Sequence, residues 1–136
     1  MASIRRETQI DACPETAWAA LRDVGALHTR LVPGFVTDTR LEDGARVVTF
    51  GNGMVVRELI VDVDDAARRL AWSAVGGVMT HHNASAQVFA EGTGCRFVWI
   101  ADLLPDEVAP AIAAMIEQGM AVIKRTLERT ERERAA

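Results

Sequence analysis

Two kinds of hydrophobic pattern divide the chain. The central part carries short runs rich in valine, isoleucine, tryptophan and threonine, separated by turn residues such as Asp43-Gly44 and Gly76-Gly77. Runs of this composition between such turns are typical of β-strands joined by hairpins. We expect strands at residues 35–41, 46–50, 54–63, 68–75, 80–90 and 95–103. Since no helical pattern separates them, consecutive strands should pair antiparallel, as a meander.

The two flanks of this region have different patterns. Residues 3–11 are predicted as a first strand, and Pro14 and Glu15 then open a helix, because proline and an acidic side chain both suit a first helical turn. A short second helix is expected near residues 24–30. After Pro105, apolar residues recur every three or four positions and predict one long amphipathic helix. Its apolar stripe consists of Val108, Ile112, Met115, Ile116, Gly119, Val122, Ile123 and Thr126.

These elements predict an α+β fold. An antiparallel sheet of about seven strands buries one face and shows the other to water. The terminal helix, of roughly 25 residues and about 37 Å, is the only element long enough to cover that face. A twisted sheet of this size curls. We therefore expect a curved sheet wrapping the C-terminal helix, with two short helices after the first strand.

Composition narrows the class of protein. The chain has 136 residues, of which 49% are hydrophobic and 25% charged, which fits one domain over residues 1–136. A net charge of −4 argues against nucleic-acid binding, which needs a basic surface. No apolar run is long enough for a transmembrane segment and no secretory signal is evident. Two cysteines, Cys13 and Cys95, favour a reducing cytoplasm. We expect a cytoplasmic monomer or homodimer.

Strand alternation predicts which side chains face the helix, because successive side chains point to opposite faces of a sheet. Residues 80–90 split into a polar set containing His81 and a second set that should point inward. Residues 68–75 and 95–103 divide in the same way. The inward set is Leu70, Trp72, Ala74, His82, Ala84, Ala86, Val88, Phe97, Trp99, Ala101 and Leu103. Val98 and Ile100 should then point outward, as scattered surface apolar residues or as a dimer contact.

The inward set contains little side-chain volume. Ala74, Ala84, Ala86 and Ala101 are small, and Gly119 interrupts the helical stripe at a cost of roughly 1 kcal/mol relative to alanine. Either space is left for a ligand, or the helix approaches the sheet closely at Gly119. Met115 would be an adaptable apolar group beside such a space.

The order of elements, together with several short segments, resembles the START-like (SRPBCC) superfamily, whose architecture is the helix-grip fold. Within it, the chain is similar to the polyketide cyclase/dehydrase and lipid-transport family. The segments that carry the resemblance are residues 14–18, 56–58, 64–70, Trp72, 76–77 and 94–99. The resemblance implies an elongated cavity between sheet and helix that holds a hydrophobic or amphipathic, lipid- or polyketide-like molecule.

Two ionisable residues are candidates for chemistry in that cavity. Periodicity alone favours Val55, Leu59, Val61 and Val63 as the buried set of their strand, which would leave Glu58 in solvent. The resemblance implies instead that Glu58 faces inward, with Val56 and Ile60 beside it. His82 could contact a ligand or act as an acid/base group, or it could be a buried histidine satisfied by the backbone or by Glu58.

Three functions follow from these candidates. The first is binding of a small molecule by Glu58, Ile60, Trp72, Ala74, His82, Ala84, Ala86, Phe97, Trp99, Met115 and Gly119. The second is a cyclase, aromatase or dehydratase that uses His82 and Glu58 as acid and base. The absence of tyrosine departs from cyclase-type members of the superfamily, several of which place tyrosine and arginine in the pocket. The third is a protein-interaction module that uses the outer sheet face at Val98 and Ile100.

No motif points to other chemistry. The sequence lacks HExxH, CxxC, Walker, GxGxxG and GxSxG signatures. His81 and His82 lie next to each other and should therefore point to opposite faces of a strand. We expect neither a metal site nor a cofactor.

Overall fold

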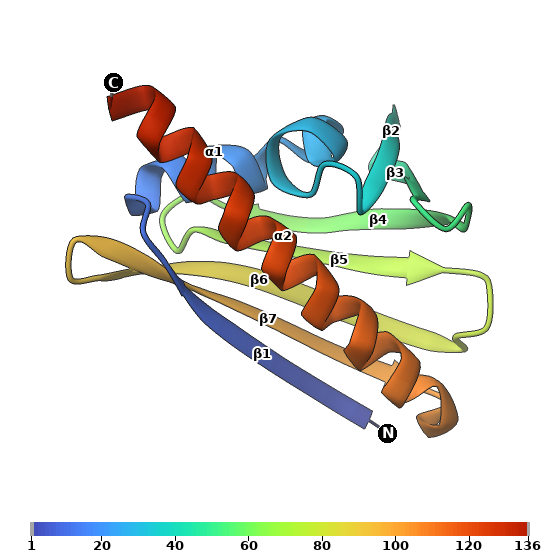
Figure 1. Ribbon diagram of the computed structural model, residues 1–136. Helices are drawn as coiled ribbons and strands as arrows, with labels where there is room; N and C mark the ends of the chain where they lie inside the picture. The colour runs from blue at the N-terminus through green and yellow to red at the C-terminus, as the bar shows by residue number, and fades with distance from the viewer. Residues whose placement is uncertain (1, 136) are drawn as a thin grey trace.

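A seven-stranded antiparallel sheet and a long C-terminal helix dominate the computed structural model, which describes residues 2–135 (Figure 1). The strands are β1 (Ala2–Ile10), β2 (Val36–Glu42), β3 (Ala45–Phe50), β4 (Val55–Asp64), β5 (Arg69–Val75), β6 (His81–Glu91) and β7 (Gly94–Leu104). The helices are α1 (Pro14–Arg22) and α2 (Ala109–Ala135). The predicted α+β class and strand meander are confirmed.

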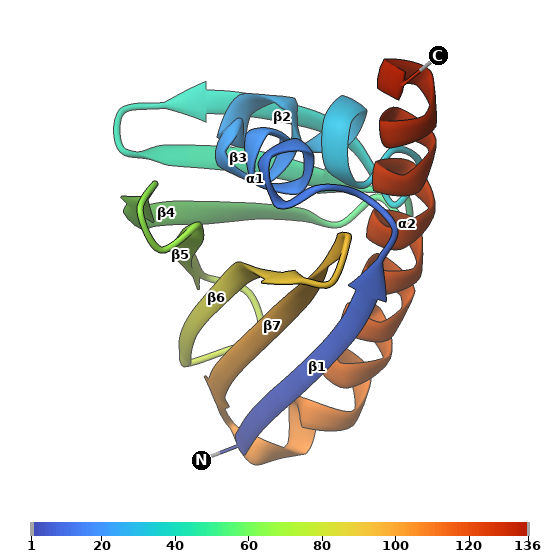
Figure 2. The same cartoon turned by 90° about the vertical axis from the view of Figure 1, so that its left-hand side faces the viewer.

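The order of strands across the sheet is β1-β7-β6-β5-β4-β3-β2, so the first strand pairs with the last. Figure 2 shows the sheet bent into a trough, with α2 lying across its open side. The central strands follow the predicted alternation. Ala84, Ala86 and Val88 of β6 are buried, as are Phe97 and Leu103 of β7. This face and α2 enclose the hydrophobic core.

The long helix begins a few residues later than predicted. Asp106–Val108 form a single 3₁₀ turn (η3), and the α-helical hydrogen-bonding pattern starts at Ala109. Pro110 is therefore the second residue of α2, inside the first turn, where its missing N–H has no intrahelical partner to lose.

The short second helix is replaced by two irregular turns. Val24–Ala26 form a 3₁₀ turn (η1), and Leu27–Leu31 form one π-helical turn (η2). Gly25 packs directly on Leu41: a Cβ at this glycine would lie 3.0 Å from Leu41 Cδ1. The pair of turns brings Leu27 and Leu31 over the β2–β3 side of the trough.

The simple alternation fails in β4. Ile60 lies opposite Trp72 of β5, but the next pair joins Asp62 to Ala71, so Val61 is an extra, bulged residue. Val55 and Val61 are 60% and 58% exposed, whereas Glu58 is 8% exposed. The periodicity-based assignment of Val55, Leu59, Val61 and Val63 as one buried set is therefore wrong. Valine is favoured on either face of a strand, so its spacing did not report burial.

The outer face at β7 also differs from expectation. Val98 points outward between Glu7 of β1 and Gln87 of β6. It is nevertheless only 4% exposed. It is therefore not an exposed surface residue, whereas Ile100, two residues further along the strand, is half-buried.

Candidate ligand-binding cavity

A cavity of about 110 Å³ lies between the concave face of the sheet, the N-terminal half of α2 and η2. Its wall is apolar except for three ionisable side chains, Arg46, Glu58 and His82. The apolar part of the wall includes Trp72, Phe97 and Trp99 from the sheet and Ile112, Met115 and Ile116 from α2. Trp72 and Trp99 meet edge to face, with ring centroids 5.9 Å apart.

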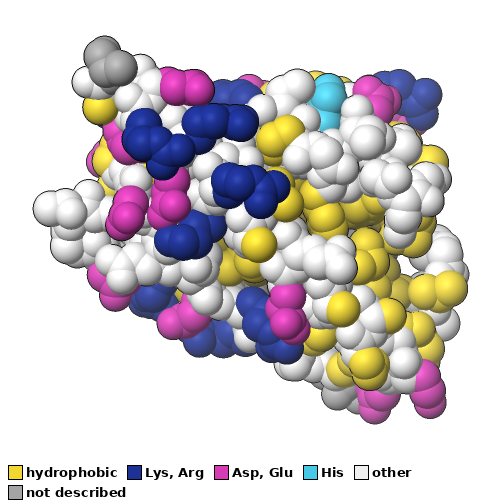
Figure 3. All heavy atoms as spheres, viewed as in Figure 1, with side chains coloured by type: hydrophobic (Ala, Val, Ile, Leu, Met, Phe, Trp, Pro, Cys, Tyr) yellow, Lys and Arg dark blue, Asp and Glu magenta, His cyan; other side chains and the backbone are white. Residues whose placement is uncertain are grey.

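The cavity opens beside the N-terminal half of α2. Met54, immediately before β4, and Ile112 and Met115, on α2, line the cavity while keeping part of their surface in solvent. Figure 3 shows apolar side chains gathered beside α2 on its right-hand side, where the molecule is hollowed. Flexible methionines at such an opening let its width change without breaking the fold.

The structure brings most of the predicted ligand-binding residues to this wall. The predicted residues that line the cavity are Glu58, Trp72, Ala74, His82, Ala86, Phe97, Trp99 and Met115. Three predicted residues do not line it. Ala84 is buried in the packed core, and Ile60 lies half-buried opposite Trp72.

Gly119 is the third residue outside the wall, and its environment explains the glycine. A Cβ added there would lie 3.1 Å from Trp99 Cζ3 and 3.3 Å from Phe35 Cε2. The glycine thus allows α2 to pack directly on the rings of Trp99, from β7, and Phe35. Of the two explanations that the sequence left open, close approach is the one that the structure shows.

The polar centre of the wall is an ion pair between neighbouring strands. Arg46 of β3 lies directly opposite Glu58 of β4, with both side chains on the concave face. Arg46 Nε donates to Glu58 Oε1 at 2.9 Å, and the two side chains are only 4% and 10% exposed. Arg46 Nη1 also donates to the Val24 carbonyl at 3.4 Å. The guanidinium carbon lies 5.8 Å from the centre of the Trp72 ring, within the range of cation–π attraction.

Arg46 is a residue of the candidate site that the sequence interpretation missed. It alternates with Val48, which is fully buried, so both point to the same face of β3. That signal was available in the sequence, because Val48 and Phe50 are apolar and Arg46 shares their parity. Because arginine side chains usually lie at the protein surface, this shared parity was not interpreted as an inward position for Arg46.

His82 points inward, but its ring is held by the backbone. The β5–β6 ladder ends at the Trp72–Ala84 pair, and the strands separate beyond it. The freed Ala74 N–H donates to His82 Nδ1 at 2.9 Å, and Ser73 Oγ donates to the His82 carbonyl at 2.5 Å. An Nδ1 that accepts a hydrogen bond carries no proton, so the ring is the neutral tautomer protonated at Nε2.

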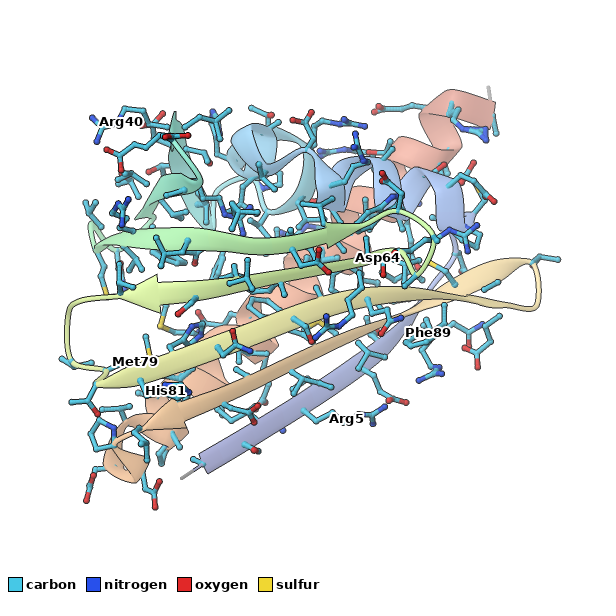
Figure 4. All side chains as sticks on the ribbon, turned by 180° about the vertical axis from the view of Figure 1, so that it is seen from behind. Arg5, Arg40, Asp64, Met79, His81 and Phe89 are labelled. Carbon is cyan, nitrogen blue, oxygen red and sulfur yellow. The ribbon has the colours of Figure 1, made fainter. Side chains whose placement is uncertain are left out.

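Electrostatics at His82 favour the same neutral form. Burial lowers the pKa of His82, and the neighbouring His81 lowers it further, while Asp102 raises it. His81 lies on the outer face, close to Met79 at the turn between β5 and β6 (Figure 4). A second, more open hollow of about 570 Å³ lies at this end of the sheet, and His82 and Ala74 line both spaces.

The two residues predicted as acid/base candidates, Glu58 and His82, line the same cavity but form their hydrogen bonds elsewhere. Glu58 is bonded to Arg46, and His82 is bonded to Ala74, with no hydrogen bond joining Glu58 to His82. Within residues 2–135, no group of three or more His, Cys, Asp or Glu residues is placed to hold a metal ion. In the same range, no helix has the length and hydropathy needed to cross a membrane.

Comparison with known proteins agrees with this architecture. The model of a family described as "Polyketide cyclase / dehydrase and lipid transport" matches residues 1–131. No curated protein matches the sequence.

Solved structures show the same fold at low sequence identity. The protein XoxI from Bacillus cereus is 17% identical, with a TM-score of 0.81, over 100% of this chain and 99% of its own. A Thalictrum norcoclaurine synthase point mutant, solved with a transition-state analogue, is 20% identical, with a TM-score of 0.76, over 99% and 96%. A START superfamily protein from Mycobacterium smegmatis is 10% identical, with a TM-score of 0.71, over 96% and 97%.

Proposed function

Because the chain belongs to the polyketide cyclase/dehydrase and lipid-transport family, with a START-like fold, we propose that it binds a hydrophobic or amphipathic small molecule in the cavity between the sheet and α2. The observation that carries this proposal is the buried Arg46–Glu58 pair in a wall that is apolar apart from this pair and His82. Apolar walls with a few fixed polar groups are typical of small-molecule sites.

The size of the cavity indicates what enters without rearrangement. Its volume of about 110 Å³ approaches the roughly 150 Å³ of an apolar cavity that binds benzene. Ligand pockets in general span about 300–1,000 Å³. A single ring therefore fits the cavity nearly as it stands, and a longer lipid- or polyketide-like molecule displaces Met54 and Met115 at the opening.

Binding without chemical conversion is the function we favour. A cyclase or dehydratase needs a free acid and a free base aimed at the substrate. Here Glu58 Oε1 accepts from Arg46, and His82 Nδ1 accepts from the Ala74 amide, so the carboxylate is paired with a cation and the basic nitrogen of the imidazole is occupied. The cyclase alternative predicts turnover of a polyketide-like substrate that is lost in His82→Ala while binding survives. The binding proposal predicts that a bound molecule is recovered unchanged.

The proposal is tested by titrating the ¹⁵N-labelled protein with p-xylene and following the tryptophan indole N–H signals by NMR. Trp72 and Trp99 line the cavity, so their signals should shift in a saturable manner. Trp18 is an internal control, because its indole N–H donates to Asp65 Oδ1 outside the cavity wall.

Filling the cavity should abolish the response. Ala86→Phe places a ring in the cavity wall, whereas Ala90→Phe places the same ring at an exposed position on the same strand. We expect the Trp72 and Trp99 shifts to disappear in the first variant and to persist in the second. Equal binding by both variants, or shifts confined to Trp18, would contradict the proposal.

A further inference from the structure

We infer that the ligand is electrically neutral and carries one group, such as a hydroxyl, that both donates and accepts a hydrogen bond at the Arg46–Glu58 pair. This inference rests on the proposed binding function and specifies the chemical class of the ligand. It follows from the charge and the hydrogen bonding of the cavity wall.

Each member of the pair keeps one polar atom available. The bonds that hold the pair use Arg46 Nε, Arg46 Nη1 and Glu58 Oε1. They leave Arg46 Nη2 and Glu58 Oε2 without a partner among residues 2–135. In that same range, no side-chain nitrogen or oxygen is both sealed from water and unbonded. Both atoms therefore reach open space, and the space next to these buried residues is the cavity.

The two available atoms have opposite hydrogen-bonding roles. Arg46 Nη2 can only donate, and an ionised Glu58 Oε2 can only accept. A hydroxyl group satisfies both at once, because it accepts from Nη2 and donates to Oε2. Hydrogen bonds to ionised groups are about twice as strong as neutral ones, which makes this the strongest polar contact that the wall offers.

The balance of charge argues against an anionic ligand. Glu58 already pairs with the guanidinium of Arg46, so the wall has no cation left unpaired at this point. A carboxylate bound there would lie beside the Glu58 carboxylate and would itself be stripped of water. Both effects oppose binding. A hydrocarbon avoids the repulsion but leaves the two free atoms without a bound partner.

A matched series of ligands tests the inference: p-cresol, p-xylene and 4-methylbenzoate differ only in one ring substituent. Near neutral pH, the cresol hydroxyl is neutral and the benzoate is ionised. In the NMR titration, we expect p-cresol to bind about tenfold more tightly than p-xylene. We expect 4-methylbenzoate to bind at least about tenfold more weakly than p-cresol.

Glu58→Gln tests the electrostatic cause directly. The amide still offers an oxygen to Arg46 Nε but removes the negative charge, so Arg46 becomes an unpaired cation in the wall. Binding of 4-methylbenzoate should then strengthen about tenfold relative to binding of p-xylene by the same variant. Glu42→Gln is the matched control, because Glu42 pairs with Arg57 at the exposed surface. It should leave the order of the three ligands as in the natural protein.

The outcomes separate the two proposals. If the natural protein binds 4-methylbenzoate as tightly as p-cresol, or if Glu58→Gln does not improve 4-methylbenzoate binding, the inference is wrong while binding itself stands. If none of the three compounds shifts the Trp72 and Trp99 signals, the proposed binding function fails. Should Glu58→Gln not fold, the ranking by the natural protein alone decides.

Discussion

The two halves of α2 meet the sheet in different ways. In the C-terminal half, Thr126 and Leu127 are almost fully buried and lie outside the cavity wall. Glu128 and Glu131 of the same half accept hydrogen bonds from the backbone amides of Asp11 and Cys13, at 3.0 and 2.7 Å. In the N-terminal half, Ile112 and Met115 are only half-buried and lie over the cavity.

This contrast shows how one helix serves two purposes. Side-chain packing and polar bonds hold its C-terminal half to α1 and to the end of β1, so that half supplies stability. The N-terminal half is opposed by small residues such as Ala74 and Ala86, and the space left there is the cavity. A molecule can therefore enter at one end while the other end keeps the sheet and helix together.

The largest expected effect comes from removing a packed side chain. Leu127→Ala should lower the free energy of unfolding by about 3–4 kcal/mol, since Leu127 is fully buried and its removal leaves a void. Met115→Ala, on the cavity side of the same helix, should cost less than about 1 kcal/mol, because space already adjoins it. Urea denaturation measures both. Equal losses would mean that the two halves of α2 are packed alike.

At the cavity end, removing one member of the Arg46–Glu58 ion pair should lower the free energy of unfolding more than any other single change. Glu58→Ala leaves the Arg46 guanidinium buried without its partner and should cost about 3 kcal/mol. Replacing both residues, as Arg46→Met with Glu58→Leu, should restore stability to within about 1 kcal/mol but abolish the preference for p-cresol. The same denaturation experiment, combined with the titration above, tests this. A double variant as unstable as Glu58→Ala would show that the pair is needed for folding rather than for recognition.

Gly119→Ala tests the boundary between the two halves. Alanine favours the helix by about 1 kcal/mol, but its methyl group would press on Trp99 and Phe35. Both rings line the cavity and have space to move into, so we expect a change in stability below about 1 kcal/mol of either sign. Binding of p-xylene should weaken, because the displaced rings enter the cavity. A large loss of stability with unchanged binding would contradict this account.

The smallest expected effect is on the pH dependence of stability, through His82 at the cavity end. The native pKa of His82 lies below its unfolded value of about 6.5, so at mildly acidic pH the unfolded chain binds more protons than the native one. The contribution of His82 to stability is thus present above that value and is lost as pH falls through it. Tm measured between about pH 7.5 and 5 should fall less steeply in His82→Gln than in the natural protein.

The sequence predicted the fold and part of the site because both depend on patterns of neighbouring residues along single strands and helices. Alternation along β5, β6 and β7 identified Trp72, Ala86, Phe97 and Trp99 as inward-facing, because each of these strands is regular where those residues lie. It failed in β4, where the valines at Val55 and Val61 suggested the wrong inward face and a bulge at Val61 then shifts the period. The inward position of Glu58 came from the resemblance to a family and not from its own strand.

Sequence alone thus determined the order of elements, the single sheet, the covering helix and the inward faces of the regular strands. These properties depend on neighbours along the chain and on hairpin turns, which a local pattern encodes. The tertiary structure decided the rest. It paired Arg46 with Glu58 across two strands, bound the His82 ring to the Ala74 amide, and made Gly119 a contact point and not a cavity residue. Each of these depends on where strands separate and how closely α2 approaches the sheet, and those distances are set only when all the side chains are packed together.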